Sequence, residues 1–225
     1  MNLKSDFEKY GRVWLRNALS ENELSYLDEA ADTQVKAGQR LRPSDGLNKA
    51  FSANTSLMKG IRQLDPNAKA VRVVAFNKSE EANWGVPWHQ DRIIAIDKRE
   101  DIAGYSNWSR KAGIWHCEPP QDILDQMLFV RVHLDDNDQS NGAMEIAVGS
   151  HINGMVAANE AENEAQRYPI EVCNAKRGDV LILKMLTLHS SKPAKIQSGR
   201  RVIRIDFSSA ELPEPLKWAS VNHES

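Results

Sequence analysis

The chain has 225 residues, of which 41% are hydrophobic and 27% charged, and its formal net charge is −2. This length and composition suit one large β-rich domain with a sizeable core, and they argue against disorder. The near-neutral charge gives no electrostatic reason to bind nucleic acid or an anionic membrane, so we expect neither as a partner. The N-terminus lacks the apolar core of a signal peptide, and we expect a cytoplasmic protein. Cys117 and Cys173 are far apart in the sequence and read as two isolated thiols in a reducing compartment.

The N-terminal region combines a short strand with helices. Arg12–Leu15 is a strand candidate. Ser20 and Glu23 have the spacing of a capping box, and Leu24 and Leu27 then supply the apolar stripe of a helix. Residues 32–54 are polar and interrupted by glycine and proline, so we expect a loop there. A second, shorter helix is predicted at about residues 55–64, before Pro66.

The remainder of the chain is predicted to be mainly strands. The candidates are residues 70–76, 86–94, 127–134, 143–148, 170–173, 180–188 and 202–207. Residues 97–121 show few alternating signals, and we expect an irregular active-site loop that carries Trp108 and His116. Residues 157–167 fit a solvated helix or a mobile loop. Short strands joined by glycine, proline and asparagine turns indicate an antiparallel barrel or jelly roll with helical additions.

Three polar residues at the ends of apolar runs are candidate metal ligands. His89 and Asp91 lie two residues apart in a strand-like run, so both side chains would emerge on the same face. His189 ends the apolar run that starts at Asp179. Two histidines and one carboxylate with open positions opposite form the facial triad of non-haem Fe(II) oxygenases. A single His-x-Asp pair is weak evidence, and the third ligand at the right place gives the pattern its specificity.

The order and spacing of several motifs are similar to those of the phytanoyl-CoA dioxygenase family of Fe(II)/2-oxoglutarate-dependent oxygenases. The motifs are His89-Gln-Asp91, Leu134-Asp-Asp136, Asn141-Gly142, Gly149-Ser-His151, Gly178-Asp179, His189-Ser-Ser191 and Arg200. The resemblance runs from about Val71 to Ser209. It implies a double-stranded β-helix (jelly roll, cupin-like) with N-terminal helices packed on the barrel. The expected organisation is therefore one domain over residues 1–225, with the N-terminal strand and helices at about 1–66 and the β-helix core at about 70–209.

The resemblance also implies roles for individual residues. Iron would be held by His89, Asp91 and His189. The far carboxylate of 2-oxoglutarate would bind Arg200, eleven residues after the distal histidine, with Ser191 and Arg131 near the same cosubstrate. An arginine suits this role because its planar fork binds a carboxylate through two hydrogen bonds. The ordinary alternatives are a surface charge for Arg200, a backbone contact for Ser191 and a salt bridge for Arg131.

The expected activity is that of a dioxygenase that uses Fe(II), 2-oxoglutarate and O2 to hydroxylate a small molecule, releasing succinate and CO2. Arg72, Trp108 and His116 are candidate substrate contacts, although aromatic residues more often cover a core edge. A metal-dependent hydrolase and a non-catalytic cupin-like metal-binding module remain alternatives, but neither gives Arg200 a role. An acyl-CoA substrate would need a basic groove, and the main basic cluster is Lys192, Lys195, Arg200, Arg201 and Arg204. The sequence leaves the identity of the substrate and the oligomeric state open.

Overall fold

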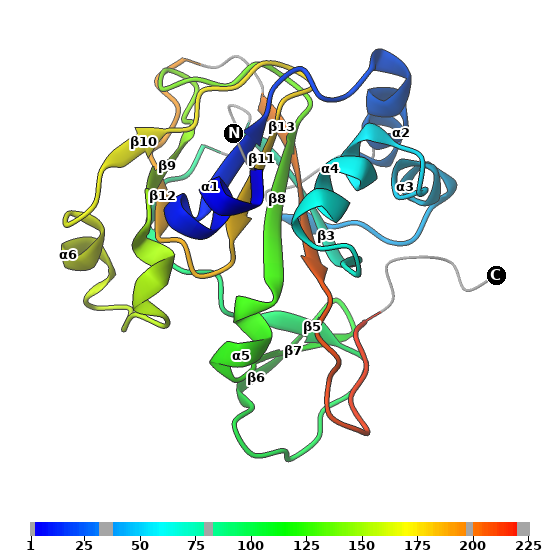
Figure 1. Cartoon of the computed structure of the whole chain (residues 1–225), viewed down its shortest axis with the longest axis vertical. Coiled ribbons are helices and arrows are strands. Elements are labelled where there is room, and N and C mark those ends of the chain that lie inside the picture. Colours follow the sequence, from blue (N-terminus) through cyan, green and yellow to red (C-terminus); the bar gives the residue numbers. More distant parts are fainter. Residues whose placement is uncertain (1–2, 32–37, 79–82, 197–199, 220–225) are drawn as a thin grey trace.

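Two antiparallel β-sheets face each other at the centre of the computed structural model, which describes residues 3–31, 38–78, 83–196 and 200–219 (Figure 1). The larger sheet contains, in spatial order, β1 (Arg12–Leu15), β11 (Val180–Lys184), β8 (Met127–His133), β13 (Arg200–Ser208), β3 (Lys69–Lys78) and β2 (Gln39–Arg40). The smaller sheet contains β10 (Ile170–Val172), β9 (Met144–Ala147), β12 (His189–Ser191) and β4 (Val86–His89). The mainly β, jelly-roll architecture predicted from the sequence is confirmed.

Helices cover the outer face of the larger sheet. They are α1 (Leu3–Tyr10), α2 (Glu21–Ala31), α3 (Asp45–Ala50) and α4 (Ser56–Leu64), while α5 (Gln121–Asp125), the 3-10 helix η2 (Ser150–Asn153) and α6 (Ala161–Ala165) lie elsewhere in the chain. Figure 1 shows α2, α3 and α4 together on one side of β3, β8 and β13, with β9, β10 and β12 on the other side. In the described part of the chain, no helix has both the length and the apolar character needed to cross a membrane.

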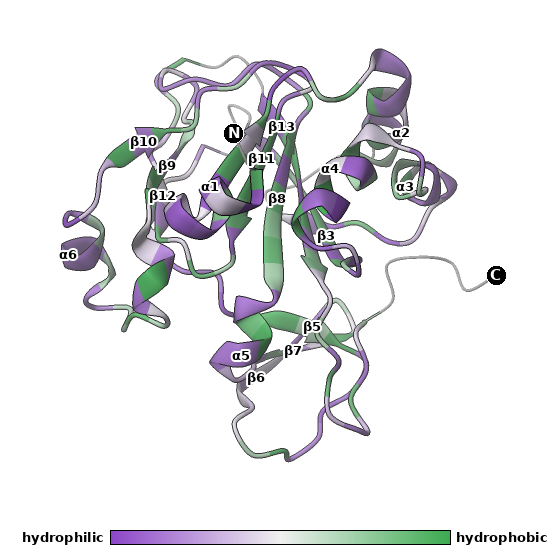
Figure 2. Cartoon of the chain, in the orientation of Figure 1, coloured by the Kyte–Doolittle hydropathy of each residue, from purple (hydrophilic) through white to green (hydrophobic). Residues whose placement is uncertain are grey.

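Alternation along the strands of the larger sheet creates two cores. On β8, Val130 and Val132 pack against the helices, whereas Phe129 points between the two sheets, because successive side chains leave a strand on opposite faces. Figure 2 shows the apolar character of β8 beside helices whose outer surfaces are polar. The interior between the sheets therefore receives every second residue of β8, and the same holds for β13. This interior holds the site described below.

The capping box predicted at the start of the first long helix is confirmed. The backbone N–H of Ser20 donates to the Glu23 carboxylate at 3.0 Å, and the N–H of Glu23 donates to the Ser20 hydroxyl at 3.3 Å. Leu24 and Leu27 on the same helix are buried. The helix predicted at residues 55–64 is present as α4, with Thr55 as its N-cap.

Two expected loops contain regular structure. Residues 45–50 form α3, because the Ser44 hydroxyl accepts from the backbone N–H of Leu47 and caps a short helix there. Residues 97–121 include most of a three-stranded sheet in which β7 (Ile114–Glu118) lies between β5 (Ile94–Ile96) and β6 (Ser106–Lys111). The prediction of an irregular loop there was wrong because β6 is largely exposed and interrupted by a bulge, so its sequence lacks apolar alternation. The prediction of a loop at residues 32–54 is tested only from residue 38 on, because residues 32–37 lie outside the described residues.

Candidate metal and cosubstrate site

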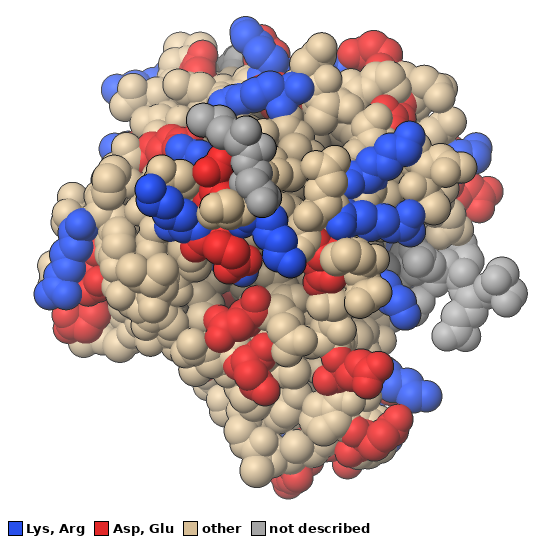
Figure 3. Space-filling view, viewed as in Figure 1, with Lys and Arg blue, Asp and Glu red and all other residues tan. Residues whose placement is uncertain are grey.

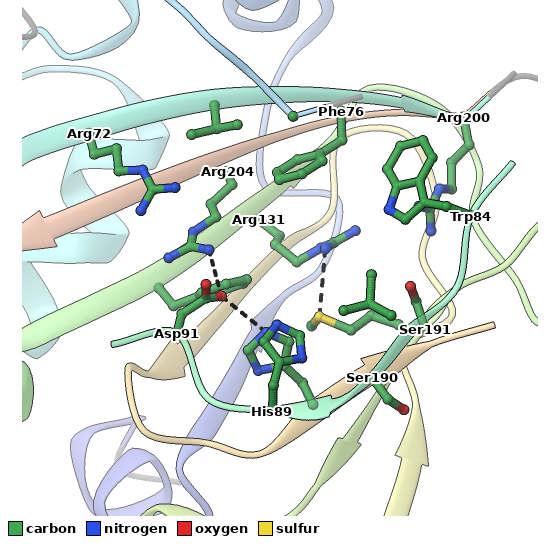
Figure 4. A pocket seen from close by; sticks show the side chains of 16 residues that line it. Arg72, Phe76, Trp84, His89, Asp91, Arg131, Ser190, Ser191, Arg200 and Arg204 are labelled. Atoms are coloured by element: carbon green, nitrogen blue, oxygen red, sulfur yellow. Dashed lines mark hydrogen bonds and ion pairs between the residues drawn. The ribbon is translucent and has the colours of Figure 1, made fainter. Parts of the chain in front are cut away.

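A cavity of about 280 Å³ opens between the two sheets and is lined mainly by strand residues (Figure 4). Its charged lining residues are Arg72, Asp91, Arg131, Arg200 and Arg204, and its apolar lining includes Val74, Phe76, Phe129 and Met144. His89, His189, Ser190 and Ser191 line the same cavity from the smaller sheet. Figure 4 shows Arg72 and Arg200 at opposite ends, with Arg204 and Arg131 between them and His89 and Asp91 on the facing wall.

The two histidines and the aspartate predicted as metal ligands meet on this facing wall. One ligand atom from each of His89, Asp91 and His189 lies within 4.8 Å of the other two. His89 and His189 are directly paired across β4 and β12, and their ring centroids are 4.3 Å apart. Among the described residues, this is the one group of three histidine, cysteine or acidic side chains with such a spacing. We refer to these three residues as the triad.

The strand boundaries around the triad differ from the sequence-based expectation. β4 ends at His89, and Asp91 follows it in an irregular segment before β5. His189 begins β12 instead of ending the preceding strand, because β11 stops at Lys184 and a turn intervenes. The side chains still converge, because strand pairing between β4 and β12 brings the two histidines together.

Backbone carbonyls orient both imidazoles of the triad. Nδ1 of His89 lies 2.9 Å from the carbonyl oxygen of Pro87, and Nδ1 of His189 lies 2.9 Å from that of Thr187. A carbonyl oxygen only accepts, so Nδ1 of each ring carries the proton and donates it. The lone pair is then on Nε2, which is the arrangement that metal-binding histidines require. Burial, followed by the neighbouring His189, lowers the pKa of His89 and keeps its imidazole neutral.

Arg204 connects Asp91 to the larger sheet. Its Nη1 lies 2.5 Å from Oδ2 of Asp91, and its Nε and Nη2 donate to the two carboxylate oxygens of Asp206 at 2.7 and 3.1 Å. Oδ2 of Asp91 also lies 3.1 Å from Nε2 of His189. Burial raises the pKa of Asp91, but the nearby charge of Arg204 opposes burial, and this pKa lies well below its usual range. Asp91 is therefore a carboxylate whose position is set by a buried arginine.

Arg200 lies at the far end of the cavity, where turn residues hold only part of its guanidinium. Nη1 donates to the carbonyl oxygen of Gly142 at 2.6 Å and to Oδ1 of Asn137 at 3.3 Å. Gly142 has φ +79°, a conformation that glycine adopts readily, and this turn directs its carbonyl towards the arginine. Nε of Arg200 is buried and has no hydrogen-bond partner among the described residues. Burial and then the charge of Arg131 lower the pKa of Arg200 to about 9.

Arg131 is a second guanidinium without an anionic partner in the described part of the chain. Nη1 contacts the sulfur of Met144 at 3.6 Å, while Nε and Nη2 are buried and unpaired. Burial lowers the pKa of Arg131 to about 10. His133, two residues further along β8, has a pKa lowered to about 3 by burial and by Arg131, so it is neutral and adds no charge. Among the described residues that line this end of the cavity, none is acidic.

The other residues predicted for the site are placed unequally. Ser191 and Arg72 line the cavity, and Ser191 lies near its Arg200 end (Figure 4). Trp108 does not line the cavity and instead packs against the hydrophobic core, with the Arg99 guanidinium 5.9 Å from its ring. His116 is buried on β7 outside the lining, and burial with Arg72 and Arg40 lowers its pKa to about 4.

The sequence reading missed Arg204 and Asp206 as part of the site. Arg204 had been counted in a basic cluster with Arg201, but the two lie on opposite faces of β13. Arg201 pairs with Asp135 and Asp28 beside the helices, whereas Arg204 points between the sheets. Side chains alternate along a strand, so residues 202, 204 and 206 share the inner face with Arg200. This alternation could have identified Arg204 and Asp206 as residues of the site.

Solved structures with low sequence identity share this fold. The epimerase SnoN in complex with Fe3+, alpha ketoglutarate and nogalamycin RO is 15% identical, with a TM-score of 0.66 and coverage of 99% of this chain and 92% of that one. EctD from S. alaskensis in its apoform is 18% identical, with a TM-score of 0.65 and coverage of 94% and 78%. HygX from Streptomyces hygroscopicus with nickel and 2-oxoglutarate bound is 14% identical, with a TM-score of 0.62 and coverage of 92% and 85%. No curated protein matches the sequence.

A family comparison decides the class of the protein. The family model described as phytanoyl-CoA dioxygenase (PhyH) matches residues 7–202, which is most of the chain and includes the triad and Arg200. The motifs quoted from the sequence and the geometry of the cavity point to the same class. The chain therefore belongs to the phytanoyl-CoA dioxygenase family, and it is an enzyme that depends on Fe(II) and 2-oxoglutarate.

Proposed function

We propose that this enzyme hydroxylates a small molecule, with Fe(II) held by His89, Asp91 and His189 and with 2-oxoglutarate held by Arg200. The observation that carries the proposal is the pairing of two features in one cavity. A triad of metal-binding side chains lies on one wall, and two buried guanidiniums with unpaired N–H groups, those of Arg131 and Arg200, lie on the other. The first feature fits a cation and the second fits an anion.

The donor set of the triad fits Fe(II). Two neutral imidazoles and one carboxylate are the ligands of the facial arrangement found in non-haem iron oxygenases, which leaves coordination positions for other molecules. The carbonyls of Pro87 and Thr187 fix the tautomers so that both Nε2 atoms are free to bind. Arg204 keeps Asp91 ionised and aligned with His189. These contacts pre-organise the three ligands.

The unpaired guanidiniums fit a dicarboxylate. A buried, unpaired charge is costly, and a carboxylate that binds Arg200 would remove part of that cost. Gly142 and Asn137 immobilise one edge of Arg200 and leave Nε free for the ligand. Arg131 would contribute charge and further N–H donors beside it, and the Ser191 hydroxyl would add one hydrogen bond.

When bound, Fe(II) and 2-oxoglutarate supply the oxidation by O2, which releases succinate and CO2. The chain supplies placement of the reacting groups and apolar side chains on part of the cavity wall. Val74, Phe76, Phe129 and Met144 line the cavity and limit the access of water to the reacting groups. A metal-dependent hydrolase or a non-catalytic metal module would leave the two unpaired guanidiniums without a role, so the family activity is favoured over both alternatives.

The size of the cavity favours a small substrate. Ligand pockets commonly have volumes of about 300–1,000 Å³, and this cavity of about 280 Å³ must accommodate the cosubstrate as well. A whole acyl-CoA would not fit inside it. A cytoplasmic location and the lack of nucleic-acid or membrane partners stay predictions from the sequence.

The proposal is tested by measuring succinate formed from 2-oxoglutarate under air, in the presence of Fe(II) and a library of small metabolites. We expect at least one metabolite to stimulate succinate formation by the unmodified enzyme and none to do so with His189→Ala. Succinate formation that persists unchanged in His189→Ala would contradict the assignment of the triad.

A further inference from the structure

A second group of arginines lies at the end of the cavity opposite Arg200. Arg72 on β3 lines the cavity, and its Nη1 donates to the carbonyl oxygen of Ile93 at 3.1 Å. The same Nη1 lies 3.7 Å from Oδ2 of Asp206. Asp206 is already held by two hydrogen bonds from Arg204, so it neutralises Arg72 only in part. Arg72 is the cavity arginine that neither the triad nor the cosubstrate uses.

Arg40 reinforces the positive charge behind Arg72. It lies on β2 directly opposite Val74 of β3, so its side chain leaves the sheet on the same inner face as Arg72 and Val74. Nη1 and Nη2 of Arg40 are buried and have no hydrogen-bond partner among the described residues. Burial and then the charge of Arg72 lower the pKa of Arg40 to about 10. Within the described ranges, Arg40 thus shares with Arg131 and Arg200 buried guanidinium nitrogens that no carboxylate accepts from.

The charges around the cavity do not balance after Fe(II) and 2-oxoglutarate are added. Of the charged residues described in its lining, four are arginines and one is the carboxylate Asp91. Asp206 and Arg40 lie behind this lining and add one charge of each sign. The divalent metal and the cosubstrate dianion cancel each other. A positive surplus therefore remains, and Arg40 and Arg72 place part of it away from the cosubstrate.

This surplus is a property of the interior and not of the whole molecule. The chain has a net charge of −2, and basic and acidic side chains are interspersed over the upper part of the face in Figure 3. Long-range attraction of anions to the surface does not explain arginines that are placed inside the barrel. Arginines at such positions need a local anion, because a desolvated charge is stable only when it is paired.

We infer that the substrate carries an anionic group, a carboxylate or a phosphate, that binds Arg72 with Arg40 behind it while the reacting carbon lies at the triad. This inference rests on the proposed function and specifies its substrate class. The planar guanidinium of Arg72 suits either oxyanion through paired hydrogen bonds. Only Asp206 and Arg204 lie between Arg72 and Asp91 in the chain of contacts, so the anionic group is a short distance from the carbon that is oxidised. Val74 and Phe129 make the intervening wall apolar.

The test uses the protein loaded with Ni(II) and saturating 2-oxoglutarate, so that the cosubstrate occupies the Arg200 end and no turnover occurs. Calorimetric titrations compare straight-chain carboxylates from acetate to octanoate with their primary amides and with alkyl phosphates of the same length. We expect the best acid to bind about tenfold or more tightly than its amide, since charge-assisted hydrogen bonds are lost in the amide. The relative affinities of carboxylates and phosphates identify which oxyanion is preferred.

Variants separate the inference from the proposed function. Arg72→Met and, independently, Arg40→Met should remove the preference for acid over amide, while Arg110→Met, which removes an exposed arginine on β6, should preserve it. The affinity for 2-oxoglutarate is measured first in each protein, and it also reports correct folding. If 2-oxoglutarate fails to bind the unmodified protein, the proposed function fails. If 2-oxoglutarate binds but neither carboxylates nor alkyl phosphates bind more tightly than the amides, or if either arginine variant keeps the preference for the anion, only the inference is overturned.

Discussion

Two kinds of buried arginine lie side by side in this cavity. Arg204 and Arg131 are paired across β13 and β8, yet Arg204 bonds to two carboxylates and Arg131 bonds to none that the structure describes. Burial lowers the pKa of both, but Asp206 and Asp91 more than compensate at Arg204 and raise its pKa, whereas the pKa of Arg131 falls to about 10. The comparison separates an arginine that is paired within the protein from one whose charge is available to a ligand. In the proposed function, Arg204 supports Asp91 as a metal ligand, while Arg131 and Arg200 bind the anionic cosubstrate.

The largest expected effect is on Fe(II) affinity and comes from removing a member of the triad, because the proposed reaction requires the bound metal. His189→Ala and Asp91→Ala should each lower the affinity for Fe(II) by at least about a hundredfold, because even residues that only support a ligand change metal affinity by 10–100-fold. Iron content after equilibration with Fe(II) measures this, and circular dichroism reports folding. His151→Ala, which removes a histidine outside the cavity, should keep its iron. Near-native iron in either triad variant would contradict the assignment.

Arg204→Met tests the paired arginine. It should weaken Fe(II) binding by about 10–100-fold and lower the free energy of unfolding by up to about 3–5 kcal/mol, because the buried Asp206 is left with only the more distant Arg72. Urea denaturation and Fe(II) titration measure the two effects.

Adding Asp206→Leu to Arg204→Met separates the two roles of this arginine. The double variant should regain most of the stability, because Asp206, the more deeply buried of the two carboxylates, is gone. It should not regain iron affinity, because Asp91 is still without its arginine. Recovery of both properties would mean that Arg204 serves only to neutralise Asp206.

Arg131→Met should have the opposite sign to Arg204→Met in protein free of ligands. Removing an unpaired buried guanidinium is expected to raise the free energy of unfolding by about 1–3 kcal/mol. The gain should shrink or reverse when 2-oxoglutarate and a metal are added, because the cosubstrate then lacks one of its cationic neighbours. Thermal melts with and without ligands check both parts, and a loss of stability in the ligand-free protein would show that Arg131 is not an unpaired charge.

The smallest expected effect is a pH dependence that comes from two buried neutral histidines outside the cavity lining, His133 and His116. The pKa of His133 is about 3 in the folded protein, below the ordinary value of 6.5, so the unfolded chain takes up the proton first as the pH falls. Its contribution to stability is present above about pH 6.5 and is lost below it, reaching about 1.4 kcal/mol at about pH 5.5. His116, with a pKa of about 4, acts in the same direction.

Thermal melts of the metal-free protein between about pH 7.5 and pH 5 measure this slope. His133→Leu should show a shallower loss of stability with falling pH than the unmodified protein, whatever its absolute melting temperature. An equal slope would mean that His133 already titrates normally in the folded state.

Local chemistry made parts of the fold predictable. The capping box of Ser20 and Glu23 was readable because it depends on two residues three apart, and β1 was found at Arg12–Leu15 with its bounds correct. α3 was missed because its six residues include only one large apolar side chain, Leu47, and so give little helical pattern, although Ser44 marks its start. β6 was missed because an exposed strand has no need of apolar alternation.

The site was predictable in its ligand types but not in its geometry. The convergence of His89, Asp91 and His189 followed from the resemblance and is present in the structure. Alternation along β13 could have placed Arg204 on the inner face, but its contact with Asp91 depends on how the two sheets face each other. The three-stranded sheet between residues 94 and 118 likewise moves Trp108 away from the cavity into core packing.

The most direct test of the distinction between paired and unpaired arginines is an anaerobic titration of 2-oxoglutarate into the Fe(II)-loaded protein, followed by the charge-transfer absorption of the complex. We predict that Arg200→Ala raises the dissociation constant of 2-oxoglutarate by about ten- to a thousandfold, because two charge-assisted hydrogen bonds are lost. Arg200→Lys should raise it less, and both variants should keep their iron, while Arg110→Met should match the unmodified protein. An unchanged affinity for 2-oxoglutarate in Arg200→Ala would contradict the assignment and would point to Arg131 as the residue that holds the carboxylate.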